Sequence, residues 1–289
     1  MNEKKFTSIP HNCVLNLQAV YETLKSAERK AANYILDSPE DIAGLSIVDF
    51  AGRAGCSEAT IVRLTRRLGY EGYPELKADF FAARENGGVY EYDDVSPADP
   101  PGIIIHKVFE ASIQALKDSL DMLDEDAYTR TADILGSAGT ILFAGIGDAA
   151  LVAQEAQQRF MRIGVASHFS LDSDLQLIHA SHLSPGDAVI AISHSGRSKP
   201  VIDVCKLAHD SGAAVIGITN FPVSPLAKKS DIVLQTAVFA KSMTGEVISK
   251  RITALCVVES LYLSVLFRRG GDAMDILGRS NDAVGVNKV

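Results

Sequence analysis

The chain has 289 residues, which is enough for two domains, and its 47% hydrophobic and 22% charged residues are typical of a soluble globular protein. The net charge of −8 excludes an overall basic surface, so any binding to nucleic acid must depend on a local patch. The four cysteines form no Cys-x-x-Cys pair, which argues against a metal site or a disulfide framework and favours a reducing compartment.

The sequence predicts neither a secretory signal nor a membrane span. The first twelve residues lack the apolar core of a signal peptide. The most apolar helical stretch, residues 252–267, is interrupted by Glu259 and is too short to cross a bilayer. We therefore expect a cytoplasmic protein.

Residues 1–85 predict an all-helical domain. Ser26 and Ser57 stand where helix caps are expected, and Gly55 falls between two short helices. Two short helices joined by a tight, glycine-containing turn are typical of a helix-turn-helix. The expected helices are 26–36, 47–54, 58–68 and 74–84.

The second helix of that pair, 58–68, has an apolar and a polar face. Ile61, Leu64 and Leu68 recur at helical spacing and should pack inward. The outward residues, whose arginines and hydroxyls could contact DNA, are expected to be Ser57, Thr60, Arg63, Arg66 and Arg67. Residues 1–85 hold 11 Lys/Arg and 12 Asp/Glu, so a solvated basic helix face is the competing interpretation.

Residues 86–102 are rich in glycine, proline and acidic residues and have no helical or alternating period, which predicts a linker. Beyond it, residues 103–289 should form an α/β domain that starts with helices 103–120 and 125–135. Short apolar runs then alternate with helices, which predicts a five-stranded parallel sheet covered on both faces. The expected strands are 140–144, 165–169, 188–192, 214–218 and 232–235, separated by helices 150–162, 175–183, 201–209 and 225–229.

A glycine loop follows the first expected strand. Gly145-Ile-Gly147-Asp-Ala-Ala150 matches the dinucleotide fingerprint, and Asp172 lies where that fingerprint expects an acidic residue. A nicotinamide cofactor is therefore one interpretation. We favour a protein without a cofactor, because a dinucleotide fold has no need for the second phosphate loop that follows the third strand.

That second loop, which we call the serine loop, holds Ser193, His194, Ser195, Gly196 and Ser198 between a strand and a helix. Unpaired N–H groups, the helix dipole and hydroxyl donors favour an anion there, a phosphate best of all. Capping by one serine is the simpler explanation, but three serines exceed what a cap needs. Together with the glycine loop, the pattern suits a sugar phosphate.

Two sets of residues resemble a known family. Residues 46–84, especially AGCSEATIVR (54–63) and LGYEGYPELK (68–77), resemble the helix-turn-helix of RpiR-type transcriptional regulators. Residues 126–267 resemble a SIS (sugar isomerase) domain, through FMRIG (160–164), SPGD (184–187), ISHSGRS (192–198) and ITN (218–220). Together these matches cover nearly the whole chain.

The resemblance implies a bacterial regulator whose SIS domain, a flavodoxin-like αβα sandwich, binds a phosphosugar without converting it and dimerises. The family's phosphate-binding loop falls on Ser193, Ser195, Gly196 and Ser198, with Ser198 in place of the usual threonine. Ala149 stands where the family commonly has a hydroxyl residue. Nearer the sugar we expect Gly145, Gly147, Asp172 and His179, while His194, inside the serine loop, could contact the anion.

The resulting hypothesis is a dimer that binds operator DNA under the control of a sugar phosphate, without a metal, a cofactor or a membrane. The first alternative is a phosphosugar isomerase with a helical extension, whose general base would be His179, Glu155 or Glu246. His179 is also explained as an ordinary exposed or core histidine. The second alternative is a regulatory partner protein that does not bind DNA.

Overall fold

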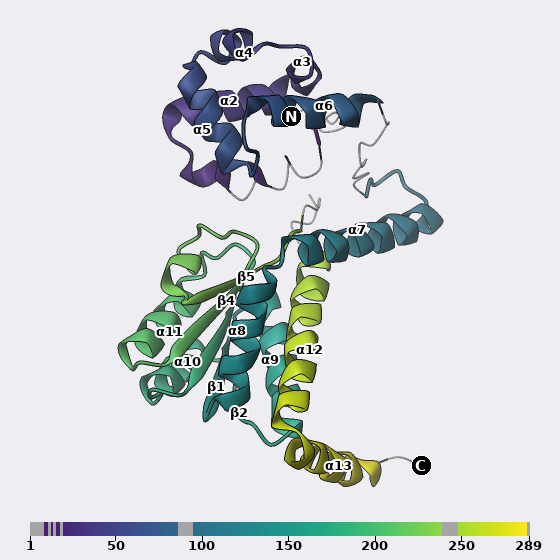
Figure 1. Ribbon diagram of the computed structural model, residues 1–289. Helices are drawn as coiled ribbons and strands as arrows, with labels where there is room; N and C mark the ends of the chain where they lie inside the picture. The colour runs from purple at the N-terminus through teal and green to yellow at the C-terminus, as the bar shows by residue number, and fades with distance from the viewer. Residues whose placement is uncertain are drawn as a thin grey trace. The chain divides into compact units, whose positions relative to one another are not determined.

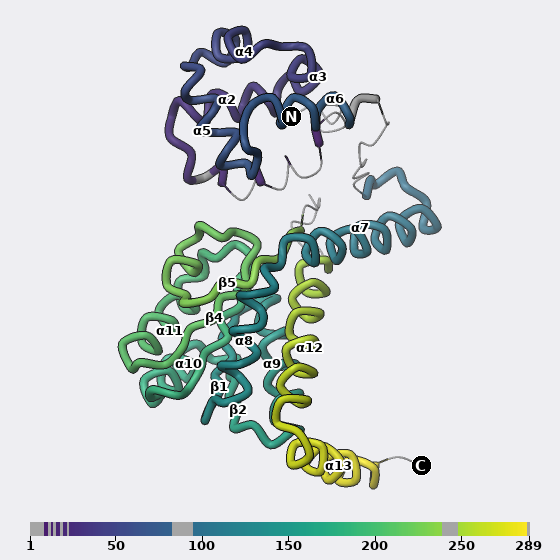
Figure 2. The backbone as a smooth tube through the Cα atoms, viewed as in Figure 1, coloured from purple at the N-terminus to yellow at the C-terminus, as the bar shows by residue number. Residues whose placement is uncertain are grey.

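The computed structural model describes residues 9–10, 13, 16–17, 20–85, 95–238 and 248–287. The chain divides into two compact units, Met1–Asp93 and Asp94–Val289 (Figures 1 and 2). Residues 86–94 of the expected linker lie outside the described residues, and its last two residues already belong to a helix. No helix in the described ranges is long and apolar enough to cross a membrane.

The first unit is helical, as expected. Its helices are α2 (Ser26–Asp37), α3 (Pro39–Ile42), α4 (Ile47–Ala54), α5 (Glu58–Arg67) and α6 (Tyr73–Glu85), preceded by the 3₁₀ turn η2 (Tyr21–Thr23). Ser46 and Ser57 cap α4 and α5 by accepting N–H groups three residues later. The turn between these helices places Gly55 at φ 65°, a left-handed conformation that favours glycine.

One expected cap was wrong. Ser26 is the first residue of α2 and not its cap. The N–H of Lys25 before it donates to the Glu28 carboxylate at 3.0 Å instead. The inward face of α5 is confirmed, since Ile61, Leu64 and Leu68 are fully buried.

The second unit contains a five-stranded parallel sheet in the order β2-β1-β3-β4-β5. Its strands are β1 (Thr140–Ala144), β2 (Ala166–His168), β3 (Ala188–Ile192), β4 (Ala214–Thr219) and β5 (Ile232–Gln235). Its helices are α7 (Pro101–Met122), α8 (Glu125–Ser137), α9 (Asp148–Arg162), α10 (Ser173–Ser181), α11 (Lys199–Asp210), α12 (Ser249–Arg269) and α13 (Gly271–Gly285).

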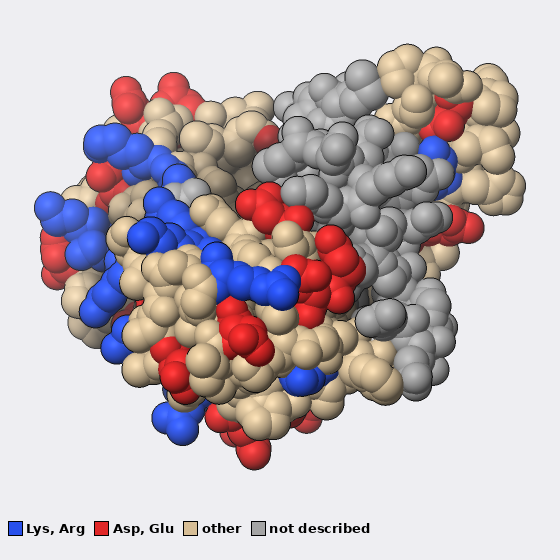
Figure 3. Space-filling view, turned by 90° about the horizontal axis from the view of Figure 1, so that it is seen from above, with Lys and Arg blue, Asp and Glu red and all other residues tan. Residues whose placement is uncertain are grey.

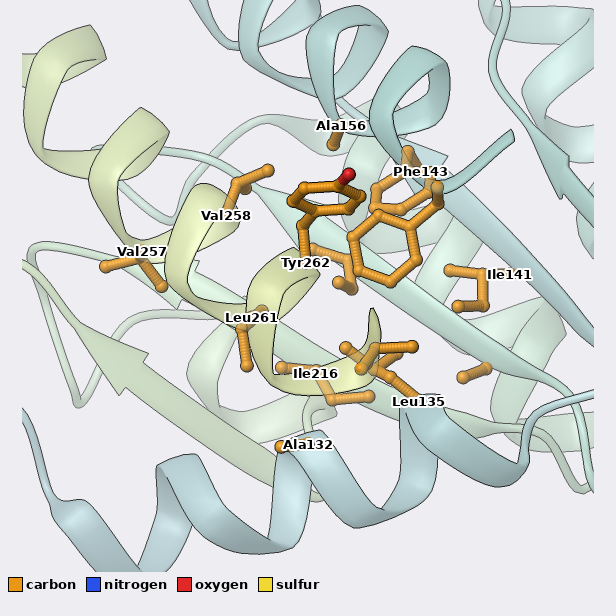
Figure 4. Close-up of a cluster of buried hydrophobic side chains, with 14 of the residues drawn as sticks. Ala132, Leu135, Ile141, Phe143, Ala156, Ile216, Val257, Val258, Leu261 and Tyr262 are labelled. Carbon is orange, nitrogen blue, oxygen red and sulfur yellow. The ribbon is translucent and has the colours of Figure 1, made fainter. Parts of the chain in front are cut away.

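Helices cover both faces of this sheet (Figure 1). Ile141 and Phe143 of β1 point to the face packed by α8, α9 and α12, where the rings of Phe143 and Tyr262 both pack against Phe160 in the core (Figure 4). Leu142 and Ala144 point to the opposite face, packed by α10 and α11. Alternate side chains of one strand therefore pack into two hydrophobic cores, one on each face of the sheet, as an αβα sandwich requires. The predicted fold class is confirmed.

Three segments differ from the expectation, the first being the short helix α3, which was not predicted. Residues 225–229 form only the 3₁₀ turn η3 (Ala227–Lys229), because the N–H of Leu226 donates to the carbonyl of Gly196 at 3.0 Å and holds the segment on the serine loop. Helix α13 was not predicted. Only Ala273 of it is buried, so its sequence lacks the apolar stripe that would indicate a helix.

Candidate functional site

The strand order brings the two predicted loops together. β1 and β3 pair in parallel, from Ile141 with Ala188 to Ala144 with Ala191, so the loops that follow them lie side by side at the carboxyl edge of the sheet. The chain leaves β1 toward β2 and crosses back to β3, which makes this position the topological switch point. This order is the flavodoxin-like one and not the 3-2-1-4-5-6 order of dinucleotide folds, which counts against the nicotinamide interpretation.

The serine loop is held by the end of β4 and by the loop that follows it. The N–H of Ser193, a residue 2% exposed, donates to the carbonyl of Ile218 at 3.1 Å, and the N–H of Asn220 donates to the carbonyl of His194 at 3.1 Å. Within the loop, the N–H of Gly196 donates to the carbonyl of Ser193 at 2.9 Å. Gly196 has φ 61°, and a Cβ there would lie 2.0 Å from Ser224 Oγ. Both facts require glycine at this position.

The serines of this loop do not act as ordinary caps. Ser198 occupies the N-cap position of α11, but its side chain accepts no N–H group of that helix. It accepts instead from Ser193 Oγ at 3.1 Å, and Ser195 Oγ accepts from the Arg197 N–H at 3.3 Å. Within the described residues, no backbone carbonyl accepts the N–H groups of Ser195, Ser198 and Lys199. These donors and the dipole of α11 can therefore serve an anion.

The glycine loop turns sharply between β1 and α9. A Cβ on Gly145 would lie 2.7 Å from the carbonyl oxygen of Ala149, and Gly147 has φ 59°. Gln176 of α10, which packs on the face of the sheet opposite to α9, contacts this loop. Its side-chain amide donates to the carbonyl of Gly145 at 2.9 Å and accepts from the N–H of Gly145 at 3.3 Å. Sequence reasoning missed Gln176, because 31 residues separate the two partners.

A cavity of about 50 Å³ adjoins both loops. Its side chains come from α9, from the ends of β3, β4 and β5, and from the start of α12. They belong to Asp148, Ala149, Val152, Ile192, His194, Ile218, Thr236, Lys250, Arg251 and Ala254. Of these, sequence reasoning had placed only His194 among the site residues. Two consecutive basic residues in the first turn of α12, where the helix dipole disfavours them, were the available signal for Lys250 and Arg251.

Four ionisable side chains set the electrostatics of this cavity: Asp148, His194, Lys250 and Arg251. Arg251 forms an ion pair with Asp148 at 2.6 Å. Burial, with a smaller contribution from Lys250, lowers the pKa of His194 to about 4. The imidazole is therefore neutral at pH 7 and packs edge-on against Phe221 at 5.9 Å between ring centroids.

Asp172 and His179 lie on the other side of β1, after strand β2. Asp172 caps α10 by accepting the N–H groups of Asp174 and Leu175 at 2.8 and 3.2 Å. His179 stacks on His168, with 4.6 Å between ring centroids. Burial, followed by the neighbouring His168 and His182, lowers the pKa of His179. Neither residue lines the cavity.

Two further candidates for a general base are Glu155 and Glu246. Glu155 forms an ion pair with Arg159 at 2.8 Å on α9, and Glu246 lies outside the described residues.

The candidate DNA-binding face of α5 differs from the expectation at two positions. Thr60 is only 2% exposed, because its hydroxyl turns in to meet Ser57 Oγ at 2.9 Å and the Arg63 guanidinium at 3.2 Å. The Arg67 side chain reaches back to α2, where it bonds the buried carboxylate of Glu28 at 3.1 Å. The expected outward orientation of Thr60 and Arg67 was therefore wrong.

Ser57, Arg63 and Arg66 are exposed, as expected. The Arg63 side chain is 63% exposed and stands 3.9 Å from Glu28. Basic and acidic side chains are intermixed on the face seen in Figure 3, in keeping with the balanced charge of the first 85 residues. Arg63 and Arg66 are thus the exposed basic side chains of α5.

Both units match known families. A family described as "SIS domain" matches residues 134–264, and one described as "Helix-turn-helix domain, rpiR family" matches residues 11–84. The chain is 33% identical over 273 residues to the HTH-type transcriptional regulator HexR of Pseudomonas aeruginosa, covering 94% of this chain and 95% of that protein. HexR of Escherichia coli is 32% identical, with 94% of each chain covered.

Among solved structures, the chain is similar to the NanR protein of Vibrio vulnificus complexed with ManNAc-6P. The TM-score is 0.62 and the identity 26%, and the match covers 96% of this chain and 99% of that one. The similarity therefore extends over both units.

Proposed function

This chain belongs to the RpiR family of helix-turn-helix transcriptional regulators that carry a SIS domain, and we propose that a sugar phosphate bound between its two loops sets its affinity for operator DNA. The observation that carries this proposal is the pairing of β1 with β3, which puts the serine loop beside the glycine loop. That NanR, a relative with the same two units, was solved with ManNAc-6P supports a sugar phosphate as the class of effector.

In this proposal the phosphate sits on the serine loop. Its oxygens accept from the N–H groups at the start of α11 and from the hydroxyls of Ser193, Ser195 and Ser198, while Gly196 lets the backbone turn beneath them. The sugar extends toward the backbone of Gly145 and Gly147 and toward His194. Asp172 and His179 follow β2, on the far side of β1, so only the end of a longer sugar would meet them.

We propose that the site binds its ligand and does not convert it. An isomerase needs a base poised over the sugar, and the two titratable acceptors that line the described cavity are poorly suited to that role. Asp148 is paired with Arg251, and the pKa of His194 is lowered to about 4. Incubation with aldose and ketose phosphates should give no interconversion, and turnover would favour the isomerase.

The DNA-contacting residues we propose are Ser57, Arg63 and Arg66. They are exposed at the start and along one side of α5, the second helix of the helix-turn-helix, which in such motifs enters the major groove. The Thr60 hydroxyl would orient Arg63 by accepting from its guanidinium, and Arg67 would hold α5 against α2 through Glu28. The protein would act at DNA in the cytoplasm, and loss of DNA retardation for every promoter fragment tested would favour a partner protein instead.

We also propose that a second copy of the chain packs on α7. Ile105, Phe109, Ile113 and Leu120 are 55%, 64%, 51% and 73% exposed and fall on one face of this helix, at spacings of four, four and seven residues. A continuous exposed apolar stripe marks an interaction surface. A dimer is the fitting partner, because operators with two half-sites require two recognition helices at a fixed separation.

The direct test replaces one hydroxyl. Ser195→Ala should abolish the response of DNA binding to the effector and leave operator affinity in its absence unchanged, since Ser195 lies in the other unit. A thermal-shift screen against phosphosugars identifies the effector first: a ligand at 100 times its Kd adds about 2.7 kcal/mol of stability. A Ser195→Ala variant that still responds at the same effector concentration would contradict the assignment of the serine loop.

A further inference from the structure

Gln176 makes an unusual set of contacts for a side chain that is 1% exposed. Its amide group brackets Gly145, accepting from the N–H at 3.3 Å and donating to the carbonyl at 2.9 Å. The same amide nitrogen donates to the carbonyl of Ser170 at 2.6 Å. One side chain of α10 thus holds both peptide groups that flank the Gly145 Cα, together with the turn after β2.

The glycine loop depends on such outside support. Its tight turn leaves no room for a side chain at Gly145, where a Cβ would lie 2.7 Å from Ala149 O. Ala149 lines the cavity with a methyl group and offers no side-chain donor. Within the described residues, no backbone carbonyl accepts the N–H groups of residues 146–149. The donors that this loop can present to a ligand are therefore backbone N–H groups, whose direction follows from the orientation of the preceding peptides.

We propose that Gln176 is the positioning residue of the effector site, which fixes the glycine loop so that its N–H groups meet the sugar part of the ligand. This inference rests on the proposed function, in which the phosphate occupies the serine loop and the sugar extends toward the glycine loop. A buried amide on a helix face that otherwise packs apolar residues is costly unless its hydrogen bonds are made, and here the three bonds go to the loop and to the turn beside it.

The test uses two variants of Gln176 and a matched control in the full chain. Gln176→Met keeps the length of the side chain and removes all three bonds, and Gln176→Glu keeps an acceptor but removes both donated bonds. The control is Gln157→Met. Gln157 lies on α9 and also donates its amide to a backbone carbonyl, that of Ser167 at 3.3 Å, without bonding either loop. Melting temperature, operator affinity without effector and ligand affinity are measured for each.

The probes are a panel of sugar phosphates that includes ManNAc-6P, and inorganic phosphate alone. The Gln176 variants should bind the sugar phosphate about tenfold more weakly, which corresponds to one or two hydrogen bonds. Their affinity for inorganic phosphate, which needs only the serine loop, should stay within about twofold of the wild type. Gln157→Met should change neither affinity, and all variants should retain operator binding without effector.

Two results would overturn the inference separately from the proposed function. Equal losses for sugar phosphate and inorganic phosphate, or losses no larger than those of Gln157→Met, would make Gln176 a residue of the scaffold alone. If Gln176→Met does not fold, Gln176→Glu decides by the same comparison. A wild-type protein that binds no sugar phosphate of the panel would refute the proposed function, and this inference with it.

Discussion

At the scale of single residues, Arg63 and Arg67 differ in what they contact although both lie on α5. The Arg67 side chain is 32% exposed and bonds Glu28 and the backbone of Thr23, so it ties α5 to α2 and to η2. The Arg63 side chain is twice as exposed and stands farther from the same carboxylate. Arg63 is thus available to a phosphate group, whereas Arg67 is a structural residue of the unit.

Alanine at these two positions should therefore give different results. Arg63→Ala should weaken operator binding and reduce the slope of log K against log salt by about 1, because one phosphate contact is lost. Arg67→Ala should lower the stability of the first unit by about 1–3 kcal/mol, since the buried Glu28 carboxylate loses its nearest charged partner. Binding assays at several salt concentrations and denaturant unfolding separate the two. An unchanged salt slope for Arg63→Ala would contradict its assignment.

His194 predicts a pH dependence of stability. Its pKa falls from 6.5 to about 4 on folding, so between these values the unfolded chain binds a proton that the folded protein excludes. Stability is then complete above pH 6.5 and decreases as the pH falls toward 4. From pH 7 to pH 5 this group alone should remove about 2 kcal/mol. His194→Gln should lack that part of the loss in denaturant titrations at the two pH values. An equal loss of stability from pH 7 to pH 5 in the wild type and in His194→Gln would contradict this prediction.

At the scale of elements, α7 carries a stripe of apolar side chains that the described residues of its own unit leave exposed. For the dimer proposed above, Phe109→Asp, in the middle of the exposed stripe, should shift the protein to monomer and weaken operator binding by reducing it to one half-site. Glu110→Arg changes the charge on the neighbouring exposed face and serves as the control. Light scattering with each variant tests this, and a Phe109→Asp protein that stays dimeric would place the interface elsewhere.

Local patterns predicted the elements well, and non-local contacts explain what was missed. β1, β3 and β5 have the predicted bounds, because apolar runs bounded by polar and glycine residues are readable within a few positions. The bond of Arg67 to Glu28 joins residues 39 apart, and that of Arg251 to Asp148 joins residues 103 apart. No pattern within one helix indicates which side chain will turn inward to such a partner.

The candidate site shows the same division. The two loops were predicted because glycines and hydroxyls at strand ends form a local motif, and the sheet order then places them side by side. The cavity beside them is completed by Lys250 and Arg251, which follow the loops by more than 50 residues. Their approach depends on how α12 packs across the sheet, which no motif in either segment specifies.

At the scale of the whole molecule, regulation requires that effector binding to the second unit and DNA binding to the first unit be energetically coupled. Coupling between sites in proteins amounts to about 1–3 kcal/mol, or roughly 5–150-fold in affinity, and it is reciprocal. Saturating operator DNA should therefore change the Kd of the sugar phosphate by the same factor by which the sugar phosphate changes the Kd of the operator. Calorimetry with and without operator DNA measures both. Equal effector affinities in the two conditions would exclude coupling.

The hydrogen bond between Ser193 and Ser198 has a consequence for what such a regulator reports. A hydroxyl of an unphosphorylated sugar could only exchange one neutral hydrogen bond for another, with little net gain, whereas a phosphate offers charged acceptors that bind about twice as strongly. Under the proposed function, the loop does not respond to a sugar that has entered the cell and is not yet phosphorylated. It responds only after a kinase has phosphorylated the sugar. Gene expression would therefore follow the concentration of the phosphorylated sugar and not that of the free sugar.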